Sequence, residues 1–421
     1  YRLTYPRPVK IDRKILLADE ELAVSTSPAG SLRVAVGYPN TYHIGMSSLA
    51  FQWIVELTAA VVDIGVERFF ADAGLIGRSL EHGSDLGEFD ILAWTCSFEL
   101  DAPNILMTLD AAGIPRLRTD RSARHPLIVV GGAVASINAL PLSPAVDVFV
   151  LGSAEILWPK FLDIASNETD RRRLLETLAA MDGFFVPSHH LDENGHPTGK
   201  RRRIEKRDVH MANPEMVPVS HIVTPHTEYS GRGLIEMSRG CPEKCRYCWV
   251  SYNYGRLRSY STDGIMARVD RLQAVTRKIG FVATAVGDHP ELAEILEQCR
   301  RRDLDVALSS LRIPAMRTEI LEPLAASGAR SVTIAPETGS DQLRRSLNKP
   351  ITNETILEAV DTAQICGIEN LKMYFIIGLP GETEDDLLGI ADLLREAQAV
   401  MVRRGRERGR VGTLHLSLIH I

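Results

Sequence analysis

The sequence predicts an α/β protein in which a flavodoxin-like, doubly wound parallel sheet is followed by a (β/α)6 partial barrel of the TIM type. Two stretches, 32–151 and 234–417, alternate short runs rich in Val, Ile and Leu with helical patterns. Continuous apolar runs are typical of strands buried on both faces, and strand–helix alternation predicts parallel sheets. A chain of 421 residues is long enough for two such domains.

The first half contains the elements of a doubly wound sheet, after a leader, 1–30, that we expect to be irregular. The expected strands are 32–37, 66–70, 90–95, 127–130 and 147–151. The expected helices are 46–64, 102–112, 154–161 and 171–181. Such sheets bind ligands at the carboxyl ends of their strands. Gly131-Gly132 and Gly152-Ser153 follow two of these ends, so this edge is a candidate ligand site.

The middle of the chain, 183–233, has a different texture. Phe184–Pro187 and the turn Glu193-Asn194-Gly195 predict a small β-hairpin, and the Pro-bearing stretch 211–225 predicts a linker. A basic run at 200–207 can attract phosphates, but it lacks the interleaved aromatic residues that stack on bases, so we favour a solvated arm. The expected domains are therefore 1–182, the hairpin and linker 183–233, and 234–421.

The second half repeats the alternation, with six expected strands of which each of the first five is followed by a helix. The expected strands are 234–237, 280–286, 305–310, 331–335, 371–377 and 412–417. The expected helices are 262–276, 290–301, 320–326, 342–347, 353–366 and 384–402, and the basic stretch 403–410 is expected to be a solvated loop. Six parallel strands predict a full or partial barrel, whose chemistry lies at the carboxyl ends of the strands.

Composition excludes several classes of protein. Hydrophobic residues make up 45% and charged residues 24% of the chain, the mean hydropathy is −0.04 and the net charge is −6. No apolar run approaches the roughly 18 residues of a membrane span, and the net charge does not indicate nucleic-acid binding. The six cysteines do not form a disulfide framework, which predicts a reducing, cytoplasmic location. The chain begins at Tyr1 and stops inside an expected strand, so we expect a fragment with a truncated barrel.

The most informative stretch is the loop that follows the first barrel strand. Cys241, Cys245 and Cys248 have the spacing C-x3-C-x2-C, with Tyr247 before the last cysteine. Three thiolates suit a 4Fe-4S cluster in which one iron keeps an open position for a substrate. The alternatives are a zinc knuckle, which requires a fourth ligand, and three buried free cysteines. We favour the cluster, because the spacing of the nearest histidines fits no familiar zinc pattern.

At these residues the chain resembles the radical S-adenosylmethionine (radical SAM) superfamily, whose members bind SAM at the strand ends of a partial barrel. By this resemblance Gly287 and Asp288 correspond to the segment that binds the SAM amino group, and Arg312 is placed to meet a carboxylate through its fork. Glu337 resembles the residue that contacts the SAM ribose or amino acid; its alternative role is an acid at a helix N-terminus. The remaining cofactor-binding candidates are Tyr247, Ser310, Gly378 and Leu379.

The resemblance implies a radical SAM enzyme with a 4Fe-4S cluster and S-adenosyl-L-methionine as cofactors. Such an enzyme cleaves SAM reductively and generates a 5′-deoxyadenosyl radical, which then acts on a substrate that these residues do not name. It also implies an electron donor such as flavodoxin or ferredoxin. No catalytic residue that acts on the substrate is assigned, and no nucleic-acid or membrane partner is indicated.

The first half is similar to the cobalamin-binding domains that precede the barrel in many of these enzymes. The turn 40–45 places His43 near the position of the cobalt-binding histidine in those domains, although a role in capping the turn is the favoured alternative. A cobalamin-dependent methyltransferase is therefore a second hypothesis. A methylthiotransferase is disfavoured, because the chain has no second cysteine cluster. A non-catalytic iron–sulfur redox sensor or metal-binding module is the hypothesis from another class.

Overall fold

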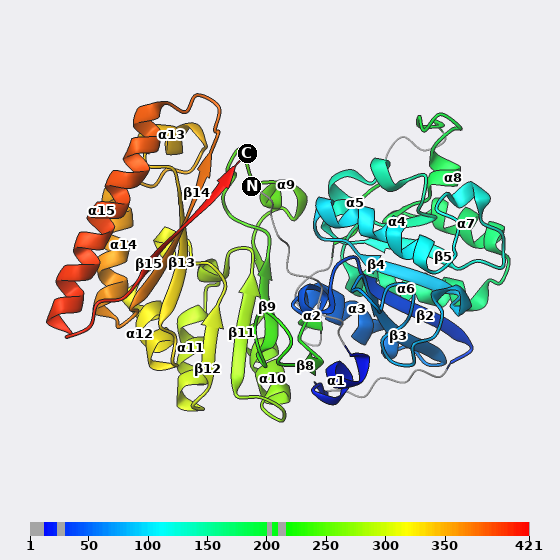
Figure 1. Ribbon diagram of the computed structural model, residues 1–421, viewed down its shortest axis with the longest axis horizontal. Helices are drawn as coiled ribbons and strands as arrows, with labels where there is room; N and C mark the ends of the chain where they lie inside the picture. Colours follow the sequence, from blue (N-terminus) through cyan, green and yellow to red (C-terminus); the bar gives the residue numbers. More distant parts are fainter. Residues whose placement is uncertain (1–11, 23–29, 200–203, 209–215, 421) are drawn as a thin grey trace. The chain divides into compact units, whose positions relative to one another are not determined.

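The computed structural model (Figure 1) describes residues 12–22, 30–199, 204–208 and 216–420. The chain divides into two compact units, each of which is described by itself. The units are Tyr1–His210 with Pro218–Gly231, and Met211–Val217 with Arg232–Ile421. Within the described ranges, no helix is both long and apolar enough to cross a membrane.

The first unit is built on a six-stranded sheet in the order β3-β2-β4-β5-β6-β7. Its strands are β2 (Leu32–Tyr38), β3 (Ile64–Phe70), β4 (Ile91–Thr95), β5 (Leu127–Gly131), β6 (Val148–Val150) and β7 (Phe184–Phe185). The first five are parallel, and β7 pairs antiparallel with β6. Counted along the chain, the parallel strands follow the order 2-1-3-4-5, which is the flavodoxin-like order of doubly wound sheets. The fold class expected for this half is therefore confirmed.

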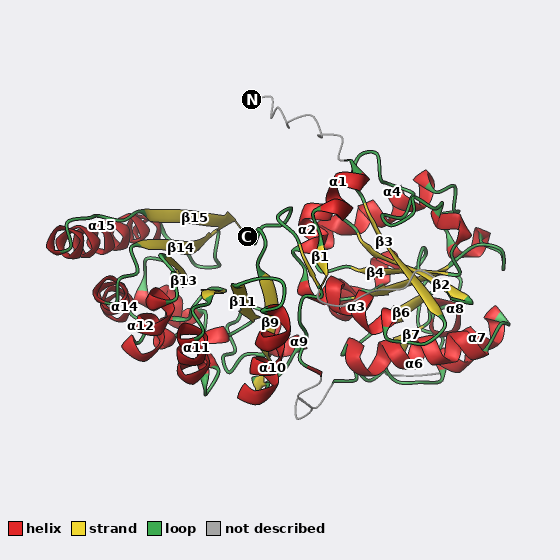
Figure 2. Cartoon of the chain, turned by 90° about the horizontal axis from the view of Figure 1, so that it is seen from below, coloured by secondary structure: helices red, strands yellow, loops and turns green. Residues whose placement is uncertain are grey.

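Helices cover both faces of this sheet (Figure 2). One face packs against α3 (Leu49–Ala59), α6 (Ala154–Asn167) and α7 (Arg171–Ala179), and the other against α4 (Ala102–Ala111) and α5 (Ala133–Asn138). Val34 and Val36 of β2 belong to the core on the first face, and Ala35 belongs to the core on the second. Successive strand residues point to opposite faces, so a sheet covered on both sides requires the continuous apolar runs seen in the sequence.

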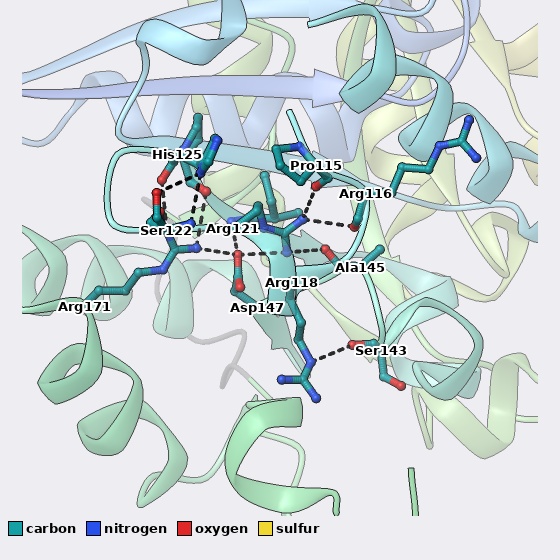
Figure 3. A network of polar contacts seen from close by, with 12 residues as sticks. Pro115, Arg116, Arg118, Arg121, Ser122, His125, Ser143, Ala145, Asp147 and Arg171 are labelled. Atoms are coloured by element: carbon teal, nitrogen blue, oxygen red, sulfur yellow. Dashed lines mark hydrogen bonds and ion pairs between the residues drawn. The ribbon is translucent and has the colours of Figure 1, made fainter. Parts of the chain in front are cut away.

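A buried carboxylate connects the amino ends of β5 and β6 (Figure 3). Asp147, directly before β6, accepts hydrogen bonds from the backbone N–H of Ile128 (2.8 Å), from Arg171 (2.8 Å) and from Arg121 (3.3 Å). The side chain of Arg121 is fully buried, and burial lowers its pKa. This network lies at the edge opposite the carboxyl ends of the strands, so we assign it a structural role.

The helix expected at 46–64 is present but shorter, because α3 begins at Leu49 and ends at Ala59. The structure has a short helix, α2 (Tyr42–Met46), followed by α3. Each helix has its own cap: the side chain of Thr41 accepts from Ile44 N–H and that of Ser48 accepts from Phe51 N–H. Two capping hydroxyls close together start two helices, and periodicity alone does not show this.

The leader 1–30 is not irregular throughout, because its described part contains α1 (Arg13–Ala18) and β1 (Glu21–Leu22). Glu20, between these two elements, is bound to Arg68 of β3 at 2.7 Å, and both side chains are 4% exposed. A charge pair buried this deeply is costly to break. The leader is therefore held on the sheet by a contact that spans 48 residues.

The described part of the stretch 211–225, expected to be a linker, is folded. It contains β8 (Ile222–Val223), which pairs antiparallel with β1. Val217 and Val219 are completely buried. Prolines interrupted the strand pattern here and concealed an apolar segment that packs in the core.

The hairpin expected near residue 190 is largely wrong. β7 joins the main sheet through β6, and the rings of Phe185 and Phe149 stack with their centroids 5.6 Å apart. The short helix α8 (Pro187–His190) follows. An isolated bridge between Leu191 and Pro197 is what the described residues show of a hairpin. The two phenylalanines have an apolar partner strand in the sheet, which a hairpin on the surface does not offer.

The second unit contains six parallel strands, which confirms the expected partial barrel. They are β9 (Gly233–Arg239), β11 (Lys278–Ala283), β12 (Asp305–Leu308), β13 (Ser331–Glu337), β14 (Asn370–Ile377) and β15 (Leu414–His420). They form two hydrogen-bonded groups: β9-β11-β12, with the antiparallel β10 (Arg258–Ser259) on its edge, and β13-β14-β15. One hydrogen bond from Leu311 N–H to Thr333 C=O, at 2.8 Å, joins the two groups.

The helices between these strands agree with those expected, except for one short helix at residues 250–253 that was not predicted. They are α9 (Val250–Asn253), α10 (Thr262–Leu272), α11 (Leu292–Arg301), α12 (Thr318–Ala326), α13 (Asp341–Ser346), α14 (Asn353–Ile365) and α15 (Glu384–Glu407). Capping boxes at Thr352 and Thr383 start the last two. Each connection returns the chain to the amino end of the next strand, so the loops after the strands gather at one edge of the unit.

The two basic runs have different outcomes. Residues 200–203 lie outside the described part of the chain, and Arg207 beside them forms a 2.8 Å ion pair with an aspartate. The stretch 403–410 is not a loop at its start, because α15 continues to Glu407. Arg404 binds Asp361 of α14 at 2.8 Å, so part of this positive charge fastens one helix to another.

Candidate functional site

The cysteine loop leaves β9 through a glycine that no other residue can replace without strain. Gly240 has φ +84°, and a Cβ added to it would lie 2.4 Å from the carbonyl oxygen of Arg256. The backbone N–H of Cys241 donates to Gly255 C=O at 3.3 Å, and the Thr284 hydroxyl donates to Gly240 C=O. The first turn of the loop is therefore held closely against the chain on both sides.

The far side of the loop is held by the segment that ends α13. Arg246 donates from its backbone N–H to Leu347 C=O (2.9 Å) and from its guanidinium to Ser346 C=O (2.6 Å). The side-chain amide of Asn348 donates to Lys244 C=O at 2.8 Å. These bonds span about a hundred residues of sequence, so nothing in the sequence around the cysteines announced them.

The three cysteines are partly exposed and form no disulfide, so the alternative of three buried cysteines is wrong. Burial raises the pKa of the Cys241 and Cys245 thiols, whereas the positive charges of Arg312, acting on Cys241, and Lys349, acting on Cys245, lower it. Each of the two sulfurs therefore has a cation that favours its thiolate form, and thiolates are the form that binds iron.

Within the described residues, no group of three or more His, Cys, Asp or Glu side chains is arranged to hold a single metal ion. This finding gives no support to the zinc alternative, which requires four ligands around one ion. A cubic cluster makes a different demand, because each thiolate binds a separate iron corner. Three thiols on one short loop, none of them in a disulfide, fit a cubic iron–sulfur cluster.

The ends of β11 and β12 bring Asp288 and Arg312 together beside the loop. Arg312 Nη1 donates to both carboxylate oxygens of Asp288, at 2.6 and 2.7 Å, and Nη2 donates to Glu243 of the cysteine loop at 2.5 Å. The fork of Arg312 is therefore shared by two carboxylates of this chain. Burial acts to lower the pKa of Arg312, but the two carboxylates raise it above its ordinary value.

The other candidates on this side differ in exposure. Gly287 is buried in a 3-10 turn (Val286–Asp288), where an added Cβ would lie 2.3 Å from the Cβ of Ala315. This close approach requires glycine. Ser310 is exposed at the end of β12, so its hydroxyl is accessible to a ligand.

On the other side of the loop, Tyr247 reaches Glu337 at the end of β13. The Tyr247 hydroxyl donates to Glu337 Oε1 at 2.7 Å, and Lys349 Nζ donates to the same oxygen at 2.6 Å. Burial and the adjacent carboxylate raise the pKa of Tyr247 well above its usual range. The alternative role of Glu337 as an acid in a helix N-terminal turn is wrong, because α13 begins at Asp341 with Ser340 as its cap.

Gly378 and Leu379 follow β14 next to these residues. Gly378 has φ +86°, and its N–H donates to a carboxylate oxygen of Glu382 at 2.8 Å. Leu379 is buried in a small apolar cluster with Ile376 and two leucines of the α13 segment, and Tyr247 packs against this cluster. Leu379 thus places the segment after β14 beside the cysteine loop.

The predicted site residues therefore fall into two groups that flank one loop. Sequence analysis missed Glu243 and Lys349, which bind predicted residues on either side. Glu243 lies inside the cysteine motif, and an acid between the cysteines was a signal that could have been used. Lys349 had no such signal, because it follows a helix rather than a strand.

In the first unit, His43 lies on the exposed surface of α2, just beyond the carboxyl end of β2. It is not the cap of that helix, a role that belongs to Thr41. Large apolar side chains are exposed directly after two neighbouring strands of this edge, namely Ile44 after β2, and Phe98 and Leu100 after β4. Exposed apolar groups gathered at a ligand-binding edge are typical of a binding surface.

Comparison with protein families finds two matches along the chain. Residues 235–394 match the radical SAM superfamily, and residues 54–187 match the family described as radical SAM proteins, N-terminal. The first range contains the cysteine loop and the ends of β11 to β14, and the second lies within the doubly wound sheet.

Curated relatives have identities near one quarter. An uncharacterised protein of Methanocaldococcus jannaschii is 26% identical over 367 residues, which cover 87% of this chain and 74% of that protein. An uncharacterised methyltransferase of Pyrococcus horikoshii is 24% identical over 58% of this chain and 51% of that protein. The ribosomal protein uS12 methylthiotransferase RimO of Desulfotalea psychrophila is 24% identical over 53% of this chain and 54% of that protein. The chain thus spans about half the length of the last two.

Solved structures share the fold over most of this chain. The radical S-adenosylmethionine methyltransferase TsrM from Kitasatospora setae, with cobalamin and a [4Fe-4S] cluster bound, has a TM-score of 0.62 at 15% identity over 92% of this chain and 72% of that chain. The cobalamin-dependent S-adenosylmethionine radical enzyme OxsB has a TM-score of 0.56 at 16% identity over 86% of this chain and 52% of that chain. At these identities the likeness shows the fold alone.

Proposed function

Because the chain belongs to the radical SAM superfamily, we propose that Cys241, Cys245 and Cys248 hold a 4Fe-4S cluster and that the adjoining strand ends bind SAM. The protein is then a radical SAM enzyme with these two cofactors. The observation that carries the proposal is the convergence of groups from the ends of β11, β12, β13 and β14 on one three-cysteine loop. Polar and charged groups from four strand ends placed around three thiols are the arrangement that a shared ligand requires.

Charge complementarity supports the roles of Asp288 and Arg312. The amino acid part of SAM carries an ammonium and a carboxylate. The 2.6 Å pair of Asp288 and Arg312 presents the opposite charges side by side, so each can exchange its partner for one end of the ligand. Glu243 already occupies one side of the Arg312 fork, and the incoming carboxylate would replace it there.

The other candidates suit the remaining parts of the ligand. Gly378 exposes backbone groups beside the buried Leu379, which together suit a flat, apolar base with polar edges. Ser310 and Glu337 offer a hydroxyl and a carboxylate to ribose hydroxyls. Gly287 leaves room for the backbone of the binding turn.

When bound and reduced, the cluster supplies one electron for cleavage of the C–S bond of SAM. The chain provides the thiolates, orients SAM and excludes water from it. Radical SAM enzymes need a reductant, and we propose a flavodoxin or ferredoxin in this role and a cytoplasmic location, in line with the six unpaired cysteines.

A cobalamin-dependent methyl transfer is a second candidate. The 2-1-3-4-5 sheet and the exposed apolar rim at its carboxyl edge favour a large, flat, apolar ligand there. TsrM and OxsB, which share the fold, are described as cobalamin enzymes. His43 is exposed at this edge and is available to bind the cobalt of a cobalamin. A cobalamin whose cobalt takes no ligand from the protein would not need it.

The experiment is anaerobic reconstitution with iron and sulfide, followed by measurement of iron content, SAM binding and 5′-deoxyadenosine formed with a strong reductant. Cys245→Ala should lose the cluster signal and 5′-deoxyadenosine. Cys366→Ala is the matched control, because Cys366 caps α14 away from the loop, and it should behave as wild type. A wild-type protein that takes up no iron, or that never binds or cleaves SAM, would refute the proposal. Cobalt content after growth with cobalamin, in wild type and His43→Ala, tests the second candidate.

A further inference from the structure

The end of β13 is built to bring a lysine and a glutamate together. Pro336 has no N–H to offer the sheet, and the pairing of β13 with β14 shifts register between Ile334 and Glu337. The interruption leaves the carbonyl of Ala335 to accept from Lys349 Nζ at 2.7 Å. Glu337 has φ +68°, a conformation that non-glycine residues adopt at an energetic cost and that persists where the surroundings hold it.

This pair is held next to the cysteine loop and is largely shielded from water. The side chain of Lys349 is 18% exposed and that of Glu337 is 9% exposed. Lys349 directly follows Asn348, whose side chain holds the loop at Lys244. The Tyr247 hydroxyl connects Glu337 to the loop at 2.7 Å. Charges in such an environment are weakly screened and act over longer distances than surface charges.

We propose that Lys349 and Glu337 set the reduction potential of the cluster, with Lys349 stabilising its reduced form and Glu337 its oxidised form. The inference rests on the proposed function, and it gives Lys349 the part of a positioning and electrostatic residue rather than a catalytic one.

The signs follow from the charge of the added electron. One-electron reduction adds one negative charge beside Cys245 and breaks no bond. A nearby ammonium stabilises that charge, and a nearby carboxylate opposes it. Removing Lys349 should therefore make the cluster harder to reduce, and neutralising Glu337 should make it easier. The double variant should lie near wild type, because the two contributions have opposite signs.

The test is a redox titration of the reconstituted full chain without SAM, followed by electron paramagnetic resonance of the reduced cluster. At fixed potential, Lys349→Met should lower the ratio of reduced to oxidised cluster about tenfold, a shift of about 59 mV for a one-electron couple. Glu337→Gln should move the ratio in the opposite direction. Lys349→Arg keeps the charge and should restore the wild-type potential.

Lys278→Met is the matched control, because it removes an exposed lysine at the amino end of β11 and should leave the potential unchanged. Shifts in the same direction for Lys349→Met and Glu337→Gln, or no shift in either, would overturn the inference while the proposed function stands. If Lys349→Met holds no cluster, the direction of the potential shift in Glu337→Gln tests the inference by itself. A wild-type protein that takes up no cluster would overturn both.

Discussion

Replacing Arg344 with methionine is expected to loosen the segment that supports one side of the candidate site. The side chain of Arg344, in α13, is completely buried. It donates to the backbone carbonyls of Thr338 and Ile351, the second at 2.9 Å, and to the side chains of Asp341 and Asn353. It therefore joins the end of β13, the start of α13 and the start of α14 around one guanidinium.

The magnitude follows from what the substitution leaves behind. Methionine fills a similar volume but donates no hydrogen bond, so two carbonyls lose bonds to a charged donor, each of which contributes about 1.5–3 kcal/mol. Asp341 is 36% exposed and can bind water instead. We expect a loss of about 3–5 kcal/mol in the stability of the second unit, the range found when one partner of a buried charged network is removed.

Hydrogen exchange followed by mass spectrometry measures this loss for each unit separately. Peptides of α13 and α14 in Arg344→Met should exchange at least about 100-fold faster than in wild type, since 1.4 kcal/mol corresponds to a factor of ten. Arg395→Met is the control, because Arg395 and its partner Asp392 are 73% and 65% exposed and such pairs contribute less than about 1 kcal/mol. Equal protection in the two variants would refute the argument from burial.

Three further outcomes are expected. Burial lowers the pKa of His289, so the unfolded chain takes up a proton at this side chain more readily than the folded protein. The free energy of unfolding should therefore fall as the pH falls below about 6.5, the ordinary pKa of histidine. Unfolding measured at a series of acidic pH values should show this decrease, and His289→Gln should make it less steep. Gly132→Ala should be less stable than Gly113→Ala by about 1–3 kcal/mol in thermal unfolding, because both glycines have positive φ but only at Gly132 would the new Cβ lie 2.6 Å from a backbone oxygen; equal losses would show that φ alone matters. Tyr247→Phe should weaken SAM binding about tenfold by calorimetry while iron content stays at the wild-type value, because Glu337 loses a buried donor; parallel loss of iron would instead give Tyr247 a role in holding the cluster.

The periodicity of apolar residues and the spacing of the cysteines were enough to predict most of the fold. The six barrel strands and the helices between them lie where the apolar runs and helical patterns predicted, because buried parallel strands and amphipathic helices leave local signatures. The cysteine spacing predicted the loop, and the carboxyl-end rule placed Asp288, Arg312 and Glu337 near it before any contact was known. Local signals failed at the ends of elements, as before α3, where the short helix α2 was not predicted and Ser48 sets the start of α3.

Tertiary structure alone decided which charges meet. Arg312 binds Glu243, 69 residues away in the sequence, and Lys349 binds the carbonyl of Ala335 at the end of β13. No sequence pattern predicts either contact. The stretch around Val217, expected to link two domains, is buried for the same reason. A strand or helix is determined by residues a few positions apart, so the sequence by itself determined these elements and the cysteine loop. A charge pair or a buried segment depends on which distant surfaces the folded chain brings together, and this only the folded structure decides.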